Sequence, residues 1–247
     1  MRGVILAAGR GSRLGSLTDE RPKCLVPLAG RTLLDWQRSA LTTAGVGELA
    51  VVTGYRGELI AERGLMTFPA RRWAETTMVG SLLAASPWLE AGPCVVSYSD
   101  IVYTASTVRA LVTAPGELAI SYDPQWAVLW HKRFADPRED AESFRLTADG
   151  CLAEIGAPLR DLSQVEGQYM GLLRFTPRSW AAALRVLNGR EGVLDMTGLL
   201  QQLVEDGQRV EAVPCDGPWC EVDGPGDLRV GEEIVRRNEE VFAWSSG

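Results

Sequence analysis

The 247-residue sequence has one histidine, no Cys-x-x-Cys pair among its five cysteines, and no Gly-Lys-Ser or Gly-Lys-Thr tripeptide. Because a P-loop requires that tripeptide, this class of nucleotide site is excluded. Strand-like residues begin directly after Met1, where a secreted protein would carry a signal peptide. Together with the lack of a Cys-x-x-Cys pair, this start predicts a protein of the reducing cytoplasm.

Positive charge and long apolar runs are also scarce. The chain carries 25 Lys and Arg against 32 Asp and Glu, a net charge of -7. This excess of acid argues against a nucleic-acid partner, so a polyanionic ligand would have to meet a local cluster of cations. No apolar run approaches the roughly 18 residues of a membrane span, so no membrane partner is expected. A hydrophobic content of 46% is enough for the core of one large domain.

The most informative stretch is at the N-terminus, where an apolar run breaks into small residues and glycines. Val4-Ile5-Leu6 predicts a buried parallel strand, and Ala7–Gly11 predicts the loop that follows it. Glycines in such a loop remove the Cβ atoms where an anion must approach the backbone N–H groups. Arg13 adds a forked donor to the same place, and Lys23 adds a point charge.

A glycine-rich loop of this kind has other interpretations. A dinucleotide-binding fingerprint needs glycine three positions after its second glycine, but Leu14 stands there. It also needs an acidic residue at the end of the next strand, whereas Leu49–Val52 runs into Thr53. The remaining alternative is a structural turn, with a strand, glycines, incidental arginines and no ligand.

Two runs, Leu6–Leu14 (L-A-A-G-R-G-S-R-L) and Pro22–Pro27 (P-K-C-L-V-P), match a known signature at each fixed position. The signature is L-A-A-G-x-G-x-R-L followed by P-K-x-L-x-P, and it resembles that of the nucleotidyltransferases that activate sugar phosphates and phosphocholine. The resemblance implies a catalytic role for Arg13 and Lys23. It implies that a nucleoside triphosphate contacts Leu6, Ala7, Ala8, Gly9, Gly11, Ser12, Arg13 and Lys23.

The order of predicted elements alternates strand and helix through the first half of the chain. We expect helices at 33–44, 57–63, 81–89 and 106–113, strands at 49–52 and 94–98, and an irregular segment at 68–77. This order predicts a Rossmann-like α/β fold, with a mostly parallel mixed sheet, helices on both faces and ligands at the carboxyl ends of the strands.

After residue 118 the pattern changes to short strands at 118–121, 126–134, 143–146 and 152–155, with an Asp149-Gly150 hairpin turn. They predict a small antiparallel insertion that forms an acceptor pocket. A strand at 169–175, helices at 179–187 and 197–205 and a strand at 210–213 would close the sheet. The single domain of 1–247 would thus comprise a nucleotide-binding part of about 1–117, an insertion of about 118–175 and a closing remainder. The amphipathic segment 227–241 predicts a packing surface or a homodimer contact.

Asp100 and Asp223 each lie at or just beyond a predicted strand. An isolated aspartate of this kind is most often an exposed turn carboxylate. In the family that the sequence resembles, a carboxylate of a G-D motif and one of a W-x-E-I/V-D motif hold the catalytic metal. The resemblance implies that Asp100 and Asp223 hold Mg²⁺ and act in catalysis, although Ser99 replaces the usual glycine. Since an ionised acceptor oxygen needs no general base, His131 is expected to be structural or peripheral.

The nucleotide base is expected at Trp73–Leu82. Thymidylyl- and uridylyltransferases of this family usually have Q-x-x-P-x-G-T-A in this place. Here Thr77 and Ser81 are similar to the T/N-x-x-x-S-L pattern of phosphocholine and aminoethylphosphonate cytidylyltransferases. The resemblance implies CTP as substrate, with contacts from Thr77, Gly80 and Ser81. The alternative is that residues 76–80 only cap the helix that follows.

The segment Asp123–Phe144 is rich in rings and carboxylates, which together can bind an amine or a quaternary ammonium. The alternative is a set of core tryptophans beside solvated acidic turns. The order of this segment and of the later runs G-C-L-A-E-I-G and E-G-Q-Y-M-G is similar to phosphocholine-type cytidylyltransferases. The resemblance implies acceptor contacts from Asp123, Trp130, Lys132, Asp140, Glu142, Glu154, Tyr169 and Glu221. A lysine that sugar-specific members carry is missing, so Lys132, Arg133 or Arg160 would hold the acceptor phosphate.

These interpretations predict a Mg²⁺-dependent transfer of CMP from CTP to a small phosphate or phosphonate, phosphocholine-like or aminoethylphosphonate-like, with release of pyrophosphate. The alternative within enzymes is a sugar- or cyclitol-1-phosphate nucleotidyltransferase that uses another nucleoside triphosphate. The alternative outside enzymes is a nucleotide sensor without turnover.

Overall fold

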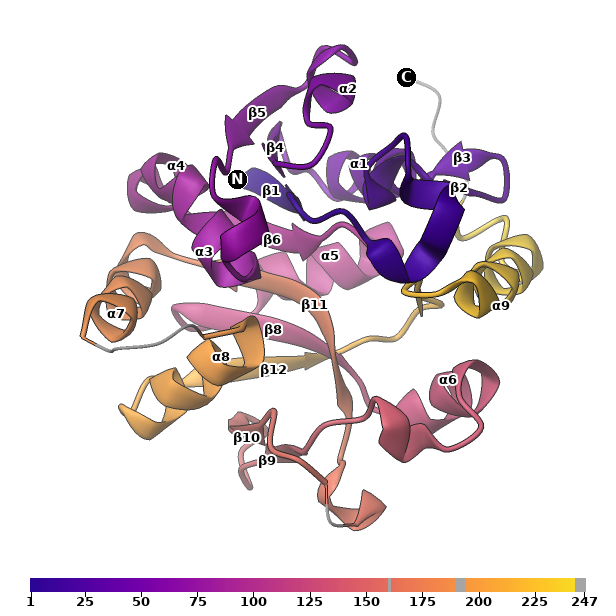
Figure 1. Cartoon of the computed structure of the whole chain (residues 1–247). Helices are drawn as coiled ribbons and strands as arrows, with labels where there is room; N and C mark the ends of the chain where they lie inside the picture. The colour runs from indigo at the N-terminus through magenta and orange to yellow at the C-terminus, as the bar shows by residue number, and fades with distance from the viewer. Residues whose placement is uncertain (160, 190–193, 243–247) are drawn as a thin grey trace.

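The computed structural model describes residues 1–159, 161–189 and 194–242. Its centre is a seven-stranded sheet with the strand order β12-β8-β11-β6-β1-β4-β5 (Figure 1). The strands are β1 Arg2–Ala7, β4 Glu48–Thr53, β5 Met66–Pro69, β6 Cys94–Tyr98, β8 Leu118–Asp123, β11 Gln168–Phe175 and β12 Val210–Pro214. β11 is antiparallel to both of its neighbours, and the other pairs in the sheet are parallel. The predicted mostly parallel mixed sheet is confirmed.

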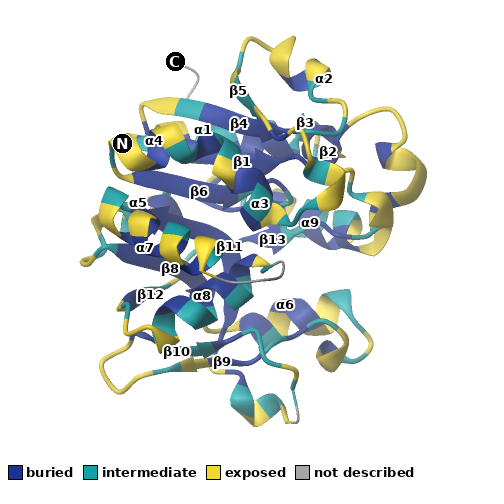
Figure 2. Ribbon diagram, turned by 60° about the vertical axis from the view of Figure 1, so that its left-hand side comes forward, coloured by how far each residue is buried: buried dark blue, intermediate teal, exposed yellow. Residues whose placement is uncertain are grey.

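Helices cover both faces of this sheet. On one face lie α3 Met78–Leu82, α4 Ser86–Ala91, α7 Pro177–Asn188 and α8 Met196–Glu205, and on the other lie α1 Leu33–Thr43 and α5 Ala105–Thr113 (Figure 1). Successive side chains of β1 enter opposite cores, with Val4 and Leu6 in one and Ile5 in the other. The central strands are therefore buried on both sides (Figure 2), which explains why β1 reads as a continuous apolar run.

Shorter elements surround the sheet. Three small antiparallel pairs are β2 Pro27–Leu28 with β3 Arg31–Thr32, β7 Ile101–Val102 with β13 Cys220–Glu221, and β9 Phe144–Leu146 with β10 Leu152–Ile155. The remaining helices are α2 Glu58–Ala61, α6 Trp126–Arg133 and α9 Pro225–Arg237. α9 buries Val235 in a third hydrophobic core with Leu14 and Trp36. The homodimer contact expected of this helix stays a prediction.

The strand expected at 126–134 is wrong, because this segment forms helix α6. Its buried residues Trp126, Leu129 and Trp130 are spaced three and four apart, which is the period of a helix face. The aromatic residues of this segment favour a strand, but their spacing is that of a helix. Arg133, the last residue of α6, contacts Glu221 and Asp227 in the C-terminal part of the chain.

Other element boundaries also differ. The segment 68–77, expected to be irregular, includes the last two residues of the edge strand β5, whose exposed Met66 weakens its apolar pattern. The helix expected at 81–89 is divided into α3, a 3-10 turn and α4, with Pro87 in the first turn of α4. The C-terminal helix ends at Arg237. β8 and β11 belong to the central sheet, so the part of 118–175 outside that sheet runs from 124 to 167.

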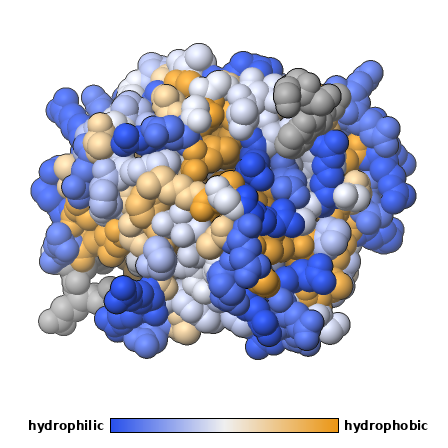
Figure 3. All heavy atoms as spheres, turned by 90° about the horizontal axis from the view of Figure 1, so that it is seen from above, coloured by the Kyte–Doolittle hydropathy of each residue, from blue (hydrophilic) through white to orange (hydrophobic). Residues whose placement is uncertain are grey.

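The surface and the cysteines agree with an ordinary globular interior and exterior. All five cysteines are free and buried. Among the described residues, no helix combines the length and apolar character that crossing a membrane requires. On the side that carries α2 and β5, apolar atoms lie among hydrophilic ones (Figure 3). Met66 is one of the exposed large apolar residues.

Candidate active site

The loop after β1 is shaped around Lys23. Gly11 has a φ of +73°, and a Cβ atom there would lie 2.7 Å from the Cβ of Lys23. Glycine is therefore needed twice, for its backbone conformation and for the close approach of the lysine. The carbonyl of Gly11 accepts a hydrogen bond from the Thr18 hydroxyl at 3.1 Å, which fixes the loop from the other side.

The Lys23 ammonium lies between the two aspartates that the sequence singled out. Its Nζ atom is 2.8 Å from Oδ2 of Asp100 and 2.5 Å from Oδ1 of Asp223. The pairing of β7 with β13 brings the two segments together, because the N–H of Val222 donates to the carbonyl of Asp100 at 2.8 Å. Arg13 completes the group at 3.1 Å from Asp223. The structure thus joins Arg13, Lys23, Asp100 and Asp223 beside the loop of Gly11.

The two aspartates of this group and the neighbouring Glu221 fit a divalent cation. Asp100, Glu221 and Asp223 each offer an oxygen, and these atoms lie within 4.8 Å of one another. Oδ1 of Asp100 is buried and has no hydrogen-bond partner among the described residues. Because a buried carboxylate oxygen without a partner is unfavourable, this atom is a free ligand position. Oxygen donors of this kind suit Mg²⁺, which takes one or two carboxylates and fills its remaining positions with phosphate oxygens and water.

Charges around the group shift several pKa values. Burial alone would lower the pKa of Lys23, but Asp100 and Asp223 raise it above the usual lysine value. Burial alone would raise the pKa of Asp223, but Lys23 and Arg13 hold it below the usual range. Burial raises the pKa of Glu221 in spite of the nearby Arg133. Lys23 is therefore a permanent cation at this site.

A cavity of about 350 Å³ adjoins this group. Its wall includes Arg13 from this group and the neighbouring Glu221. Of the predicted acceptor residues, the wall contains Trp130, Asp140, Glu142, Tyr169 and Glu221. Residues that the sequence did not single out also line it: Met78, Tyr98, Ser143, Phe144, Ile155, Gln168, Asp195, Met196 and Thr197.

Tyr98 could have been found only from the fold. It precedes the Ser99-Asp100 turn at the end of β6, and its ring lies edge-on to that of Tyr169 with 5.8 Å between centroids. Gly171 makes room for it at an irregularity of β11, because its φ is +76° and a Cβ there would lie 2.6 Å from the Tyr98 ring. The irregular strand thus places both rings on the cavity wall.

Three predicted acceptor residues lie outside this wall. Asp123 is buried, and its oxygens accept from the N–H of Gln125 at 2.7 Å and from the Trp219 indole at 2.9 Å. Lys132 is exposed on α6, and Glu154 lies opposite Arg145 in the backbone register of the β9–β10 hairpin. Asp123 braces the fold and Lys132 lies at the surface, and for all three residues the acceptor contact stays a prediction. Arg160 lies outside the described residues.

Comparison with known proteins identifies the family. A family model described as the MobA-like NTP transferase domain matches residues 3–210. The chain belongs to this NTP transferase family. The family resemblance found in the signature of the first loop is confirmed.

Relatives of this transferase include enzymes with CTP in their names. It is 36% identical to the CTP:phosphoglutamine cytidylyltransferase of Campylobacter jejuni, over 93% of this chain and 98% of that protein. It is 34% identical to the bifunctional IPC transferase and DIPP synthase of Rubrobacter xylanophilus, over 94% of this chain but only 51% of that protein. The solved inositol-1-phosphate CTP transferase from T. maritima has a TM-score of 0.79, covers 97% of each chain and is 18% identical. At that identity the structural likeness shows the fold alone.

In this NTP transferase, the predicted base-binding residues have local contacts. Thr77 is the N-cap of α3, where its hydroxyl accepts from the N–H of Gly80 at 3.5 Å. The same hydroxyl donates to the carbonyl of Leu194 at 2.5 Å. Ser81 is buried within α3. The Thr77 hydroxyl therefore caps α3, as the capping alternative expects, and also joins α3 to Leu194.

Replacing Thr77 with valine is expected to raise the KM for the acceptor about fivefold while the KM for CTP stays within twofold, since a hydrogen bond contributes about 1 kcal/mol. The reason is that the bond to Leu194 holds the neighbouring Asp195 in the cavity wall. Initial rates with each substrate varied in turn will measure both values. Thr77→Ser keeps the hydroxyl and serves as the control. A rise in the KM for CTP alone would show direct contact with the base.

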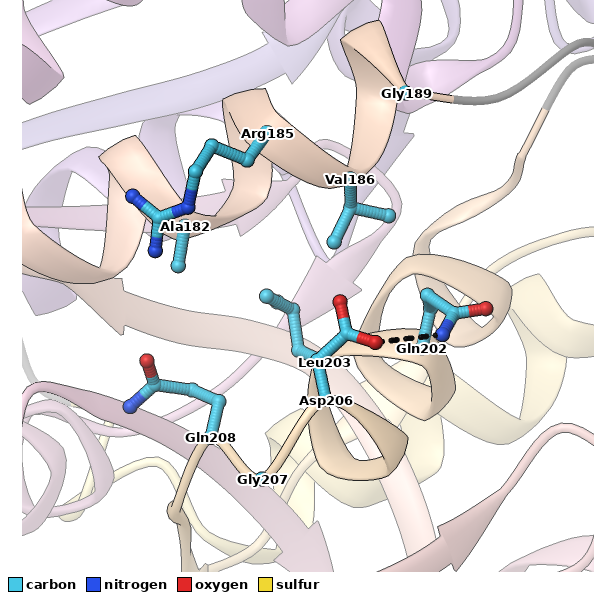
Figure 4. Close-up of a pocket in the computed structure, with 9 residues that line it drawn as sticks. All are labelled: Ala182, Arg185, Val186, Gly189, Gln202, Leu203, Asp206, Gly207 and Gln208. Carbon is cyan, nitrogen blue, oxygen red and sulfur yellow. Dashed lines mark hydrogen bonds between the residues drawn. The ribbon is translucent and has the colours of Figure 1, made fainter.

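A second cavity of about 520 Å³ lies between α7 and α8, and its wall contains none of Arg13, Lys23, Asp100 and Asp223 (Figure 4). Its charged lining residues are Arg185 on α7 and Asp206 after α8, and Gln202 donates to Asp206 at 3.0 Å. The two charged side chains do not point toward one another. This cavity holds none of the residues that the signature or the acidic motifs singled out.

Proposed function

We propose that this protein transfers CMP from CTP to a small acceptor that carries a phosphate or phosphonate at one end and a cationic amine at the other, releasing pyrophosphate. The observation that carries the proposal is the position of Lys23, which contacts Asp100 and Asp223 beside an acidic cavity of acceptor size. The name of the Campylobacter jejuni relative, a CTP:phosphoglutamine cytidylyltransferase, supports cytidine as the nucleoside.

The reaction requires two anions to meet. The acceptor oxygen attacks the α-phosphorus of CTP, a new P–O bond forms, and the bond to the β-phosphate breaks, with pyrophosphate leaving. Since the acceptor oxygen is already ionised near neutral pH, the chain needs no general base. His131, which is exposed on α6, has no part in this step.

The chain's own residues supply charge and position. Lys23 and Arg13 neutralise the triphosphate, and the glycine loop after β1 offers N–H groups to its oxygens. Asp100 and Asp223, with Glu221 beside them, would hold Mg²⁺, which supplies neutralisation of the phosphate oxygens. The cavity fixes the acceptor so that its oxygen faces the α-phosphorus.

The charge of the cavity favours an amine on the acceptor. Four carboxylates line it, those of Asp140, Glu142, Asp195 and Glu221, against one cation, Arg13. Burial raises the pKa of Glu142, and the nearby Asp195 and Asp140 raise it further. An ammonium group would relieve this repulsion, and the rings of Tyr98, Trp130 and Tyr169 can face its positive charge.

The test is pyrophosphate release in the presence of Mg²⁺, with each of five nucleoside triphosphates against a panel of acceptors. We expect release with CTP and an amine-bearing acceptor such as 2-aminoethylphosphonate, phosphocholine or a phosphorylated amino acid amide. Preference for glucose-1-phosphate or inositol-1-phosphate would instead support the sugar- or cyclitol-phosphate alternative. Tight CTP binding without release from any acceptor would indicate a sensor.

Replacing Glu142 with glutamine is expected to raise the KM for an amine-bearing acceptor about tenfold with little change in kcat, because one charge-assisted contact is lost. Initial rates at saturating CTP will measure it. Glu139→Gln is the control, since it removes the same charge from an exposed position three residues away. Equal effects of the two substitutions would contradict an amine contact and point to the overall charge of the segment.

A further inference from the structure

Arg133 is a buried cation that the transfer step does not use. It is the last residue of α6, and its side chain has 0% exposure. Its Nη1 atom donates to Oε2 of Glu221 at 2.6 Å, and its Nε atom donates to Oδ1 of Asp227 at 3.0 Å. The guanidinium also lies 3.9 Å from Asp140 and 3.8 Å from Asp223. One side chain therefore reaches carboxylates from both the acceptor cavity and the candidate metal group.

The plane of this guanidinium is fixed from two sides. Its central carbon lies 5.1 Å from the centroid of the Trp130 ring and 4.9 Å from that of Phe134. Trp130 in turn packs against Trp126 and Trp219, with 6.0 Å and 6.1 Å between ring centroids. Because the rings restrict its rotation, the guanidinium holds its acid partners in one geometry.

Asp227 extends this arrangement to the backbone of Asp223. Its Oδ2 atom accepts from the N–H groups of Asp223 and Gly224, both at 2.8 Å, while its Oδ1 atom accepts from Arg133. The Nη2 atom of Arg133 is buried without a hydrogen-bond partner in the described part of the chain, and it lies nearest to Asp223 through a 3.8 Å ion pair. The backbone N–H of Asp223 is thus connected to α6 through Asp227 and Arg133, and its carboxylate is connected to α6 through Arg133 alone.

We propose that Arg133 is a positioning residue that fixes the acceptor cavity, whose wall includes Glu221, relative to the carboxylate of Asp223. It holds Glu221 in the cavity wall and orients Asp223 toward Lys23, without touching either substrate. The inference rests on the proposed function of the same site. It makes α6, and through it the 124–167 segment, a part of the catalytic geometry as well as a wall for the acceptor.

The chemistry of the contacts requires arginine at this position. Three nitrogens of one planar group face different carboxylates, and a lysine ammonium can occupy only one of these places. Partners of this kind behind metal-binding side chains affect metal affinity by about 10-fold to 100-fold when they are removed. A small displacement of the reacting groups affects turnover by a similar factor.

The experiment compares Arg133→Lys with Arg174→Lys. Arg174 is also a buried guanidinium, but it donates to the backbone carbonyls of Val112, Pro115 and Gly116 and lies outside the cavity wall. Thermal unfolding will show the loss of stability in each variant. Steady-state kinetics will give kcat and KM for CTP and for the acceptor, and titration with Mn²⁺ followed by electron paramagnetic resonance will report the metal site independently of turnover.

We expect Arg133→Lys to lower kcat about a hundredfold and to weaken Mn²⁺ binding about tenfold, with the KM for CTP within threefold of the wild type. Arg174→Lys should lower the unfolding temperature while these constants stay within twofold. If Arg133→Lys does not fold, Asp227→Asn removes the same contact from the other side and should change both constants in the same direction.

Three outcomes would overturn the inference. One is a folded Arg133→Lys variant with wild-type kcat and Mn²⁺ affinity. Another is equal loss in Arg133→Lys and Arg174→Lys, which would show a stability effect alone. Both leave the proposed function intact. A wild-type protein that releases no pyrophosphate and binds no Mn²⁺ would instead remove the proposed function, and this inference with it.

Discussion

Replacing Lys23 with alanine is expected to lower turnover by about a hundredfold or more, because the variant loses the buried cation that we propose faces the triphosphate. Lys23 is only 8% exposed, and its ammonium contacts both aspartates. Its loss also leaves the carboxylates of Asp100 and Asp223 close together without the positive charge that offsets their repulsion. The measurement is the initial rate of pyrophosphate release with CTP and an amine-bearing acceptor. The unfolding temperature is measured as well, because repulsion between the two aspartates also lowers the stability of the fold.

Lys132 provides a matched control, since the sequence contains only these two lysines. Lys132→Ala removes the same charge from an exposed position on α6. We expect its KM for the acceptor to stay within twofold of the wild type. A larger rise would restore the phosphate-binding role that the sequence suggested for it, and a folded Lys23→Ala variant within threefold of wild-type turnover would remove Lys23 from the mechanism.

Replacing Asp223 with alanine is expected to lower turnover on the order of 10² or more and to shift the Mg²⁺ dependence to higher concentrations. Asp223 lies 2.5 Å from Lys23, 3.1 Å from Arg13 and 3.8 Å from Arg133. Its removal deletes a candidate metal ligand and leaves three cations without a shared partner. Rates measured over a range of Mg²⁺ concentrations will separate weakened metal binding from a lower maximal rate.

Glu211→Ala is the matched control for Asp223→Ala. The Glu211 side chain is 13% exposed, close to the 12% of Asp223, and it pairs with Arg209 at 2.7 Å on the outer strand β12. The control should lose stability without a change in Mg²⁺ dependence. The role proposed for Asp223 fails if the two variants have the same rates and the same dependence on Mg²⁺.

The fold was largely predictable because its strands and helices carry local patterns. β1, β4 and β6 read as apolar runs, since they are buried on both faces of the sheet. The helix α1 shows its apolar face at helical spacing, with Thr32 as the N-cap and Asp35 in the first turn. The pattern was weaker in α6, where ring-rich residues hid the helical spacing, and in the edge strand β5, which is only half buried.

The candidate site was only partly predictable. The signature residues could be recognised because chemistry requires glycine at the loop, as the +73° φ of Gly11 shows, and a cation at Lys23. Nothing in the local sequence pointed to Tyr98, and Arg133 was expected only as a holder of the acceptor phosphate, whereas its side chain is buried among carboxylates. A signal for Asp227 was present, since a proline and then an acidic residue in the first turn mark the start of a helix at Pro225.

The sequence by itself determined the transferase family, the mostly parallel sheet and the residues at the ends of its strands, because each depends on short runs of neighbouring residues. Only the tertiary structure decided which of those residues meet. Asp100 and Asp223 are joined by the β7–β13 pair, and Asp123 is turned toward Trp219 instead of the cavity. Contacts between distant segments depend on how helices and strands pack, and the order of residues along the chain does not record that packing.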